Sequence, residues 1–258
     1  MGTSTVEIVS VTSRIPDRAR EPYYRYNCWH DRLTHFGFQP TILGMGEPWS
    51  GLCNKPRRLR NWLRSGDCTS DYLISSDSYD VVFGVSPQEV VDRFTSGHFD
   101  TDAICCNAER GLFPRGDLQP FFDRADHGGS PWKYLNSGLY IGKPSVILQM
   151  LELMFLDEIH DDYQRPDGSY CHVNDQAIYQ TAWVLQEGRI NLDYNCELFQ
   201  CGSACTIDEF DLSGSHVRNI VTGTEPLVFH FNGGSKNSPE EGGIMHPMLR
   251  KWGMEHYL

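Results

Sequence analysis

The stretch Asp71-Tyr-Leu-Ile-Ser-Ser-Asp-Ser-Tyr-Asp-Val-Val-Phe83 decides how the rest of the chain is interpreted. Its apolar run, Tyr72–Ile74, has the length and composition of a buried strand. The run leads into Asp77 and Asp80, and in open α/β sheets ligands bind at such carboxyl ends of strands. Two oxygen ligands on one turn can hold Mg²⁺ or Mn²⁺ against a diphosphate. An Asx-rich surface turn would give the same pattern, because Asp and Ser favour turns.

Length and composition suit one α/β domain over residues 1–258, with 40% hydrophobic and 12% aromatic residues to build its core. The net charge of −12 weakens attraction to nucleic acid or anionic membrane, although a local basic groove stays possible. No apolar run approaches the roughly 20 residues of a membrane span. The N-terminus lacks the pattern of a secretory signal, so we predict a cytoplasmic protein with no membrane partner. Nine cysteines without a CxxC pair predict reduced, mostly buried thiols.

Strands and helices alternate along the chain, which predicts one mainly parallel sheet covered on both faces. Ser86–Glu89 forms a capping box with proline at the first helical position, and Asn174 can cap a helix begun by Asp175. Polar loops are expected at 110–133, 160–173 and 232–236. The predicted strands are 6–12, 41–43, 72–74, 102–106, 134–142 (broken by Gly138), 190–193 and 227–230. The predicted helices are 22–36, 55–64, 87–94, 145–159 and 175–188.

Seven separated pieces of the chain match one family in the same order. They are Gly44–Trp49, Ser76–Asp80, Ala108–Glu109, Leu135–Gly138 with Ile141–Gly142, Asp175–Gln176 with Tyr179, Leu192–Asp193 with Phe199–Gln200, and His230–Lys236. On these residues the chain resembles the glycosyltransferase domain of the procollagen-lysine hydroxylases, a nucleotide-sugar transferase of the GT-A type. The resemblance spans residues 6–236 and implies a GT-A-like α/β fold, with a Rossmann-related, mainly parallel sheet flanked by helices.

The resemblance implies a metal site. Asp77 and Asp80 would coordinate Mn²⁺, and His230 would be the third protein ligand. Imidazole with carboxylates suits Mn²⁺ better than Mg²⁺. The metal would bridge the diphosphate of a UDP-sugar and offset the charge developing on the leaving UDP. Taken alone, a histidine at a strand end is more often structural.

The resemblance also implies a donor site. Tyr79 would lie against the uracil ring, with Thr12 and Trp49 nearby, although Trp49 could simply be core. Lys55 and Lys236 would contact phosphate or sugar, and the glycine turn at Gly233 lets backbone N–H groups approach the diphosphate. The full set of predicted donor contacts is Thr12, Trp49, Lys55, Ser78, Tyr79, Asn232, Gly233 and Lys236.

Four further residues fall where the family has polar groups facing the sugar or the acceptor: Glu109, Asn136, Asn174 and Asp175. The family has a longer acidic run before its Asp-Gln pair, whereas this chain has Cys171-His-Val-Asn-Asp175. Asp175 is the candidate for a group near the anomeric carbon. As an acid at a helix N-terminus, it could equally interact with the helix dipole. Retention and inversion both stay open.

The predicted function is Mn²⁺-dependent transfer of glucose or galactose from a UDP-sugar to a hydroxyl acceptor, of hydroxylysine type by resemblance. Lys55–Arg64 holds five basic residues in ten, and it could follow a phosphate backbone. That makes a hydroxymethylated base in DNA an alternative acceptor, although a solvated helix face explains the charges as well. Only one carboxylate remains where the family has a longer acidic run. This supports a second alternative, a non-catalytic nucleotide-sugar or glycan-binding module.

Overall fold

A six-stranded sheet forms the centre of the fold in the computed structural model, which describes residues 4–15, 26–154, 156–159, 162–164, 170–172, 174–185 and 189–258. Its strands lie in the order β2-β1-β3-β6-β5-β9. The pairs β1–β2, β1–β3 and β5–β9 are parallel, and β6 runs antiparallel between β3 and β5. The strand bounds are β1 (Val6–Val11), β2 (Thr41–Leu43), β3 (Tyr72–Ser76), β5 (Ile104–Glu109), β6 (Tyr134–Gly142) and β9 (Ile190–Asp193).

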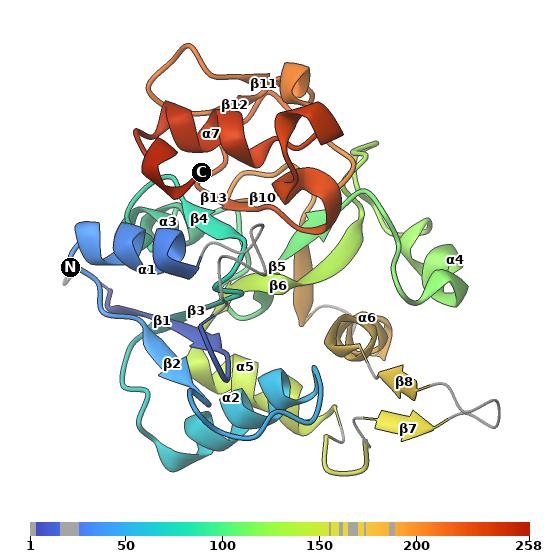
Figure 1. The fold of residues 1–258 in the computed structure, drawn as a ribbon. Coiled ribbons are helices and arrows are strands. Elements are labelled where there is room, and N and C mark those ends of the chain that lie inside the picture. The colour runs from blue at the N-terminus through green and yellow to red at the C-terminus, as the bar shows by residue number, and fades with distance from the viewer. Residues whose placement is uncertain are drawn as a thin grey trace.

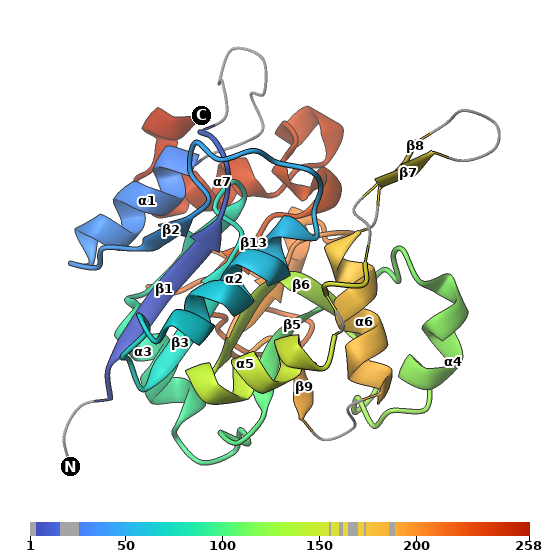
Figure 2. The same ribbon diagram turned by 90° about the horizontal axis from the view of Figure 1, so that it is seen from below.

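Alternate side chains of these strands feed two separate cores, because successive residues of a strand point to opposite faces. Val9 and Leu73 pack in one core with apolar residues of α2 (Asn54–Ser65) and α5 (Pro144–Glu152). Their neighbours Ile8 and Ile74 pack in the other core with residues of α1 (Tyr26–His35) and α3 (Pro87–Phe94). The helices therefore cover both faces of the sheet, and Figures 1 and 2 show α2 and α5 together on one side and α1 and α3 on the other.

A second sheet of three strands lies beside the first. It has the order β10-β13-β4, from Phe199–Cys201, Val228–His230 and Val81–Phe83. Strand β13 is parallel to β10 and antiparallel to β4. Helix α7 (Met245–Lys251) and the short pair β11 (Phe210–Asp211) and β12 (Arg218–Asn219) lie at this end of the molecule (Figure 1). Residues 77–80 connect β3 directly to β4, so this turn passes from one sheet to the other.

The predicted architecture is confirmed: the fold is mixed α/β with a mainly parallel central sheet. Each predicted strand corresponds to an observed strand, and α3 begins with the predicted capping box. Glu89 N donates to Ser86 Oγ, and Ser86 N donates to Glu89 Oε1. Helix α6 (Asp175–Leu185) follows its predicted cap, since Gln176 N donates to Asn174 Oδ1 at 2.9 Å. Predicted helical residues 22–25 and 186–188 lie outside the described residues.

Several predicted boundaries were wrong. Strand β6 continues through Gly138, although its pairing with β5 shifts register there, from Cys106–Tyr140 to Ala108–Leu135. Strand β5 extends to Glu109 rather than ending at Cys106. The apolar helix ends at Glu152 instead of continuing to residue 159, because the carbonyls of Leu156 and Ile159 accept hydrogen bonds from Arg57 on α2.

Three loop assignments also need correction. The loop 160–173 contains the antiparallel pair β7 (Asp162–Gln164) and β8 (Tyr170–His172). Residues 110–133 include the helix α4 (Gln119–Phe122). The closing loop forms a 3₁₀ turn over Gly233–Lys236. Short, partly polar segments such as these have little periodicity, so sequence patterns rarely detect them.

The described helices include none that is both long and apolar enough to cross a bilayer. Eight cysteines lie among the side chains that the structure describes, and all eight are free thiols. Only Cys68 among them is not fully buried. These thiols therefore agree with the prediction of reduced, mostly buried cysteines.

Candidate active site

Three predicted ligands come together where the two sheets meet. Asp77 follows β3, Asp80 precedes β4, and His230 ends β13. One ligand atom from each lies within 4.8 Å of the other two. Phe231 N donates to the Asp80 carbonyl at 2.7 Å, and β13 pairs with β4, so the backbone sets the distance between Asp80 and His230. Two carboxylates and an imidazole at this spacing can hold a divalent transition metal.

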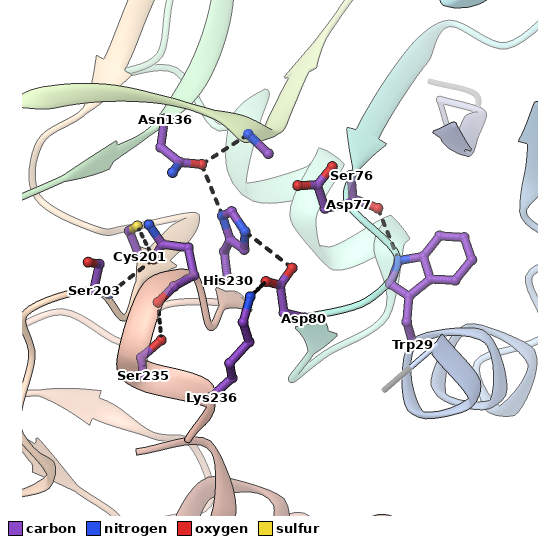
Figure 3. Close-up of polar contacts among 12 residues, drawn as sticks. Trp29, Ser76, Asp77, Asp80, Asn136, Cys201, Ser203, His230, Ser235 and Lys236 are labelled. Atoms are coloured by element: carbon purple, nitrogen blue, oxygen red, sulfur yellow. Dashed lines mark hydrogen bonds and ion pairs between the residues drawn. The ribbon is translucent and has the colours of Figure 1, made fainter. Parts of the chain in front are cut away.

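The side-chain amide of Asn136 orients the ring of His230. Its Nδ1 lies 3.0 Å from Asn136 Oδ1, which also accepts from Gly138 N at 2.9 Å (Figure 3). Because the amide oxygen of Asn136 can only accept, Nδ1 is a protonated ring nitrogen, and Nε2 is the nitrogen that a metal would bind. Nε2 lies 3.4 Å from Asp80 Oδ1, a contact that a metal would replace. The buried imidazole is therefore held in the direction that a metal ligand needs.

Gly138 provides the space for that imidazole. A Cβ atom at this position would lie 2.3 Å from His230 Cε1 and 3.0 Å from Asp77 Oδ2. A glycine inside a strand often marks such a close approach. Gly138 therefore lies where the pairing of β6 with β5 is irregular and also leaves the space that His230 occupies.

Each aspartate is paired with a lysine. Lys236 Nζ lies 2.6 Å from Asp80 Oδ2, and Lys55 Nζ lies 2.6 Å from Asp77 Oδ1 and 3.3 Å from Asp175 Oδ2. Burial opposes ionisation of Asp80, but His230 and Lys236 outweigh it and lower the pKa of Asp80. Burial likewise opposes charge on Lys55, but Asp175 and Asp77 together raise the pKa of Lys55. The site therefore holds charged carboxylates beside fixed ammonium groups.

A cavity of about 520 Å³ opens beside the metal group, and its size is that of a small-molecule site. Tyr79 is anchored there, since its hydroxyl donates to the Arg14 carbonyl at 2.7 Å and lies 2.5 Å from Thr12 Oγ1. Trp49 is 38% exposed, so it is not a core residue. The cavity lining includes six of the eight predicted donor contacts: Thr12, Trp49, Lys55, Ser78, Tyr79 and Lys236.

Glu109 forms a second carboxylate environment outside the group Asp77, Asp80 and His230. Its Oε1 accepts from Gln176 Nε2 at 2.6 Å, and its Oε2 accepts from Asn232 Nδ2 at 2.8 Å. Burial raises the pKa of Glu109, although the two amide hydrogen bonds oppose this effect. Asn232 itself accepts from Ser203 N at 3.0 Å. It therefore contacts Glu109, and neither Asn232 nor Gly233 is part of the lining of the 520 Å³ cavity.

Asn174 and Asp175 lie at the first turn of α6. Asn174 caps the helix, and Asp175 Oδ1 also accepts from Gln176 N, at 3.0 Å. Burial raises the pKa of Asp175, and the charge of Lys55 opposes the rise. Asp175 is thus an acid at a helix N-terminus that also contacts Lys55, and its predicted place near the anomeric carbon stays a prediction.

The arginines of the basic helix α2 contact carboxylates and backbone carbonyls of this chain. Arg57 donates to the Leu156 carbonyl, and Arg58, Arg60 and Arg64 form ion pairs with carboxylates. These carboxylates belong to Glu47, Asp157 and Glu152. The fifth basic residue, Lys55, faces the metal group. The described contacts of these arginines therefore do not favour a nucleic-acid backbone as their partner.

The sequence did not reveal the contacts that two residues of the site make. Gln176, noted only as part of a matched pair, joins Glu109 to neighbouring backbone, and Gly138 makes room for His230. A larger cavity of about 850 Å³ lies elsewhere, along β9. It is lined by Trp183, Tyr194 and others, with none of the predicted site residues. The residue chemistry, rather than cavity size, identifies the candidate site.

Comparisons with known proteins agree with this geometry. The family model described as the PLOD GT domain matches residues 8–241. A Caenorhabditis elegans protein named "Multifunctional procollagen lysine hydroxylase and glycosyltransferase" is 26% identical over 215 residues, covering 78% of this chain and 28% of its own length. Mouse "Procollagen-lysine,2-oxoglutarate 5-dioxygenase 1" is 28% identical over 219 residues, covering 78% and 27%. The chain thus spans about a quarter of the length of these relatives.

One solved structure shares the fold. It is a glycosyltransferase described as involved in glycosylation of the major capsid of PBCV-1, with a TM-score of 0.52 and 13% sequence identity. The match covers 98% of this chain and 99% of that one. The predicted GT-A architecture is confirmed at the level of the fold.

Proposed function

Because the chain belongs to the PLOD GT domain family, we propose that it is a metal-dependent hexosyltransferase. It moves glucose or galactose from a UDP-sugar to a hydroxyl acceptor of hydroxylysine type. The observation that carries this proposal is the group Asp77, Asp80 and His230, whose two aspartates line a cavity together with Lys55 and Lys236.

The metal is proposed to be Mn²⁺, since an imidazole with two carboxylates suits it better than Mg²⁺. Asp77, Asp80 and His230 would hold it, with Asn136 fixing the direction of the His230 ring. When bound, the ion would stabilise negative charge on the departing UDP.

The donor occupies the 520 Å³ cavity in this proposal. Tyr79, fixed by Thr12 and Arg14, presents its ring to the uracil, and Trp49 and Ser78 line the same space. Lys55 and Lys236 turn from the aspartates toward the diphosphate, so their charges stay within the site. Asn232 and Gly233 act from the Glu109 side, and Asn174 acts as the cap of α6.

Glu109 faces the acceptor in this proposal. Its raised pKa makes it a carboxylate able to take a proton from an acceptor hydroxyl, because a base works best when its pKa approaches the working pH. Asp175 would lie near the sugar in this proposal, and its contact with Lys55 supports that role. The stereochemical outcome depends on which of the two carboxylates reaches the reacting carbon.

The alternative DNA acceptor loses its support, since the arginines of α2 are bound to other groups. A binding module without activity would not need two lysine-paired aspartates beside an oriented histidine. We propose the cytoplasm as its location, because free and mostly buried thiols suit a reducing compartment. We also propose that residues 1–258 form one domain, most of which the family match covers.

The test is release of UDP from a panel of UDP-sugars with Mn²⁺, with and without a hydroxylysine peptide or hydroxymethylated DNA. We expect release to rise with the peptide and UDP-glucose or UDP-galactose, and to stop with EDTA. Asp77→Ala should abolish the Mn²⁺-dependent part. Tight Mn²⁺–UDP binding without release from any donor would favour the binding module, and release that survives Asp77→Ala would remove the metal assignment.

A further inference from the structure

An exposed phenylalanine lies beside the Glu109 environment. Phe113 is 65% exposed, although it stands in a segment that is otherwise firmly held. Single exposed hydrophobic residues are common on proteins and by themselves indicate nothing. The contacts that fix Phe113 relative to Glu109 distinguish it from such residues.

The carbonyl of Phe113 is bound twice by α6. It accepts from Gln176 Nε2 at 2.5 Å and from Gln180 Nε2 at 3.0 Å. Two residues later, Arg115 Nη1 donates to Thr181 Oγ1 at 2.8 Å on the same helix. The backbone on this side of the site is therefore pinned to α6 while the aromatic ring stays in solvent.

Gln176 ties this segment to Glu109. The two N–H groups of its Nε2 account for both contacts, one to Glu109 Oε1 at 2.6 Å and one to the Phe113 carbonyl. Its Oε1 accepts from Ser137 N on β6 at 3.5 Å. One side chain thus fixes the position of the exposed ring relative to the carboxylate.

The ring lies next to the carboxylate that we propose to face the acceptor. The lining of the donor cavity includes Thr12, Trp49 and Tyr79 but not Glu109. Gln176 joins Glu109 to the Phe113 carbonyl. An acceptor hydroxyl that gives its proton to Glu109 therefore approaches next to Phe113.

We propose that Phe113 is a specificity-determining residue that packs against the apolar part of the acceptor next to its reacting hydroxyl. The inference rests on the proposed function and adds to it a named acceptor contact. A rigid aromatic ring offers a large contact area and loses little conformational entropy on binding, which is why such residues act as binding anchors.

The test uses the full chain with Phe113→Ala, Phe113→Trp and a control, Phe121→Ala. Phe121 is 43% exposed on α4 and lines the separate 850 Å³ cavity. Three quantities are measured for each: the affinity for UDP with Mn²⁺, UDP release without acceptor, and KM and kcat for a hydroxylysine peptide and its galactosylated form. Because each ring is exposed, neither alanine variant should disturb folding.

Phe113→Ala should raise the KM of the better acceptor about tenfold, as expected for loss of an anchor contact. UDP affinity and acceptor-independent release should stay within about twofold, since a uniform binding loss affects KM alone. Phe113→Trp should restore most of the acceptor affinity, and Phe121→Ala should behave as wild type.

Unchanged KM in Phe113→Ala would overturn the inference while leaving the proposed function intact. A parallel fall of acceptor-independent release would also overturn it, because Phe113 would then only support Glu109. If the wild-type chain releases UDP from no donor, the proposed function fails first, and the acceptor contact fails with it.

Discussion

The carboxylates of Asp80 and Glu109 occupy opposite environments. Asp80 has Lys236 at 2.6 Å and the imidazole at 3.4 Å, whereas Glu109 is bound by the neutral amides of Gln176 and Asn232. Both are buried, yet the pKa is lowered for Asp80 and raised for Glu109. The charges of His230 and Lys236 keep Asp80 ionised, whereas the amide hydrogen bonds and the charge of His230 do not offset the desolvation of Glu109.

This difference separates the two tasks of the proposed reaction. A carboxylate that stays ionised suits metal and diphosphate chemistry, and one with a raised pKa suits proton transfer. Environments that push the pKa values of two carboxylates apart thereby suggest which one handles the proton. Four substitutions test this division, beginning with the one expected to have the largest effect.

Asp80→Asn should lower Mn²⁺-dependent UDP release by about a thousandfold, a loss comparable with removing the main source of charge stabilisation. The amide keeps the shape but leaves Lys236 and the metal without a charged partner. Turnover is measured together with Mn²⁺ binding by calorimetry. Asp71→Asn is the matched control, since Asp71 bonds only Thr5 among the described contacts and is remote from the cavity lining. Turnover above a tenth of wild type would contradict the metal role.

Glu109→Gln should reduce acceptor-dependent transfer about a hundredfold, the usual contribution of a general base. Mn²⁺ and UDP binding should stay unchanged, because Glu109 contacts neither Asp77 nor Asp80 in the described network. Single-turnover transfer and calorimetry measure the two effects. Glu47→Gln, at an exposed partner of Arg58, is the control. An equal loss of Mn²⁺ binding would show that Glu109 also supports the metal site, so the two carboxylates would not have separate tasks.

Gly138→Ala should weaken Mn²⁺ binding about tenfold, as changes to the support of a metal ligand do. The added methyl would meet His230 Cε1 at 2.3 Å and force the buried ring to move. Overpacking should also lower the free energy of unfolding by about 1–3 kcal/mol. Calorimetry and urea denaturation measure these effects, with Gly111→Ala as control because a Cβ there meets nothing within 4 Å. Wild-type Mn²⁺ affinity would show that His230 does not need this space.

Lys55→Ala should have the smallest effect and change sign with ligand. Without nucleotide, Mn²⁺ affinity should rise about threefold, since partly exposed ion pairs such as Lys55–Asp77 are worth at most about 1 kcal/mol. With UDP present, the affinity should fall, because the diphosphate loses a cation. Lys133→Ala is the control, because it removes a pair with Asp123 and a contact with the Tyr134 ring, neither of which belongs to the metal group. The same change with and without UDP would argue against exchange of Lys55 between aspartate and phosphate.

The metal side was predicted from the family resemblance, and local signals supported it. A strand running into Asp77 and Asp80 is visible within a few residues, whereas the strand at residues 227–230 did not by itself mark His230 as a ligand. The alternation of strands and helices likewise gave the fold class. Local patterns of this kind depend only on neighbours in the chain.

The Glu109 side could not be predicted in the same way. Its environment is built by Gln176 and Asn232, which come from α6 and the end of β13, and no spacing links them to Glu109. Gly138 looked like a strand break because the residue that needs its space, His230, lies far along the chain. The early end of α5 likewise reflects Arg57, a contact from another helix.

The turn 77–80 passes from the central sheet to the second sheet, and His230 belongs to the second sheet alone. An ion shared by Asp77, Asp80 and His230 would therefore act as a reversible crosslink, closing the long chain segment between residues 80 and 230. Closing a long loop limits the freedom of the unfolded chain, and metal-binding energy becomes folding energy. The metal would then link the two sheets, so that their motion relative to one another would be smallest while metal and donor are bound.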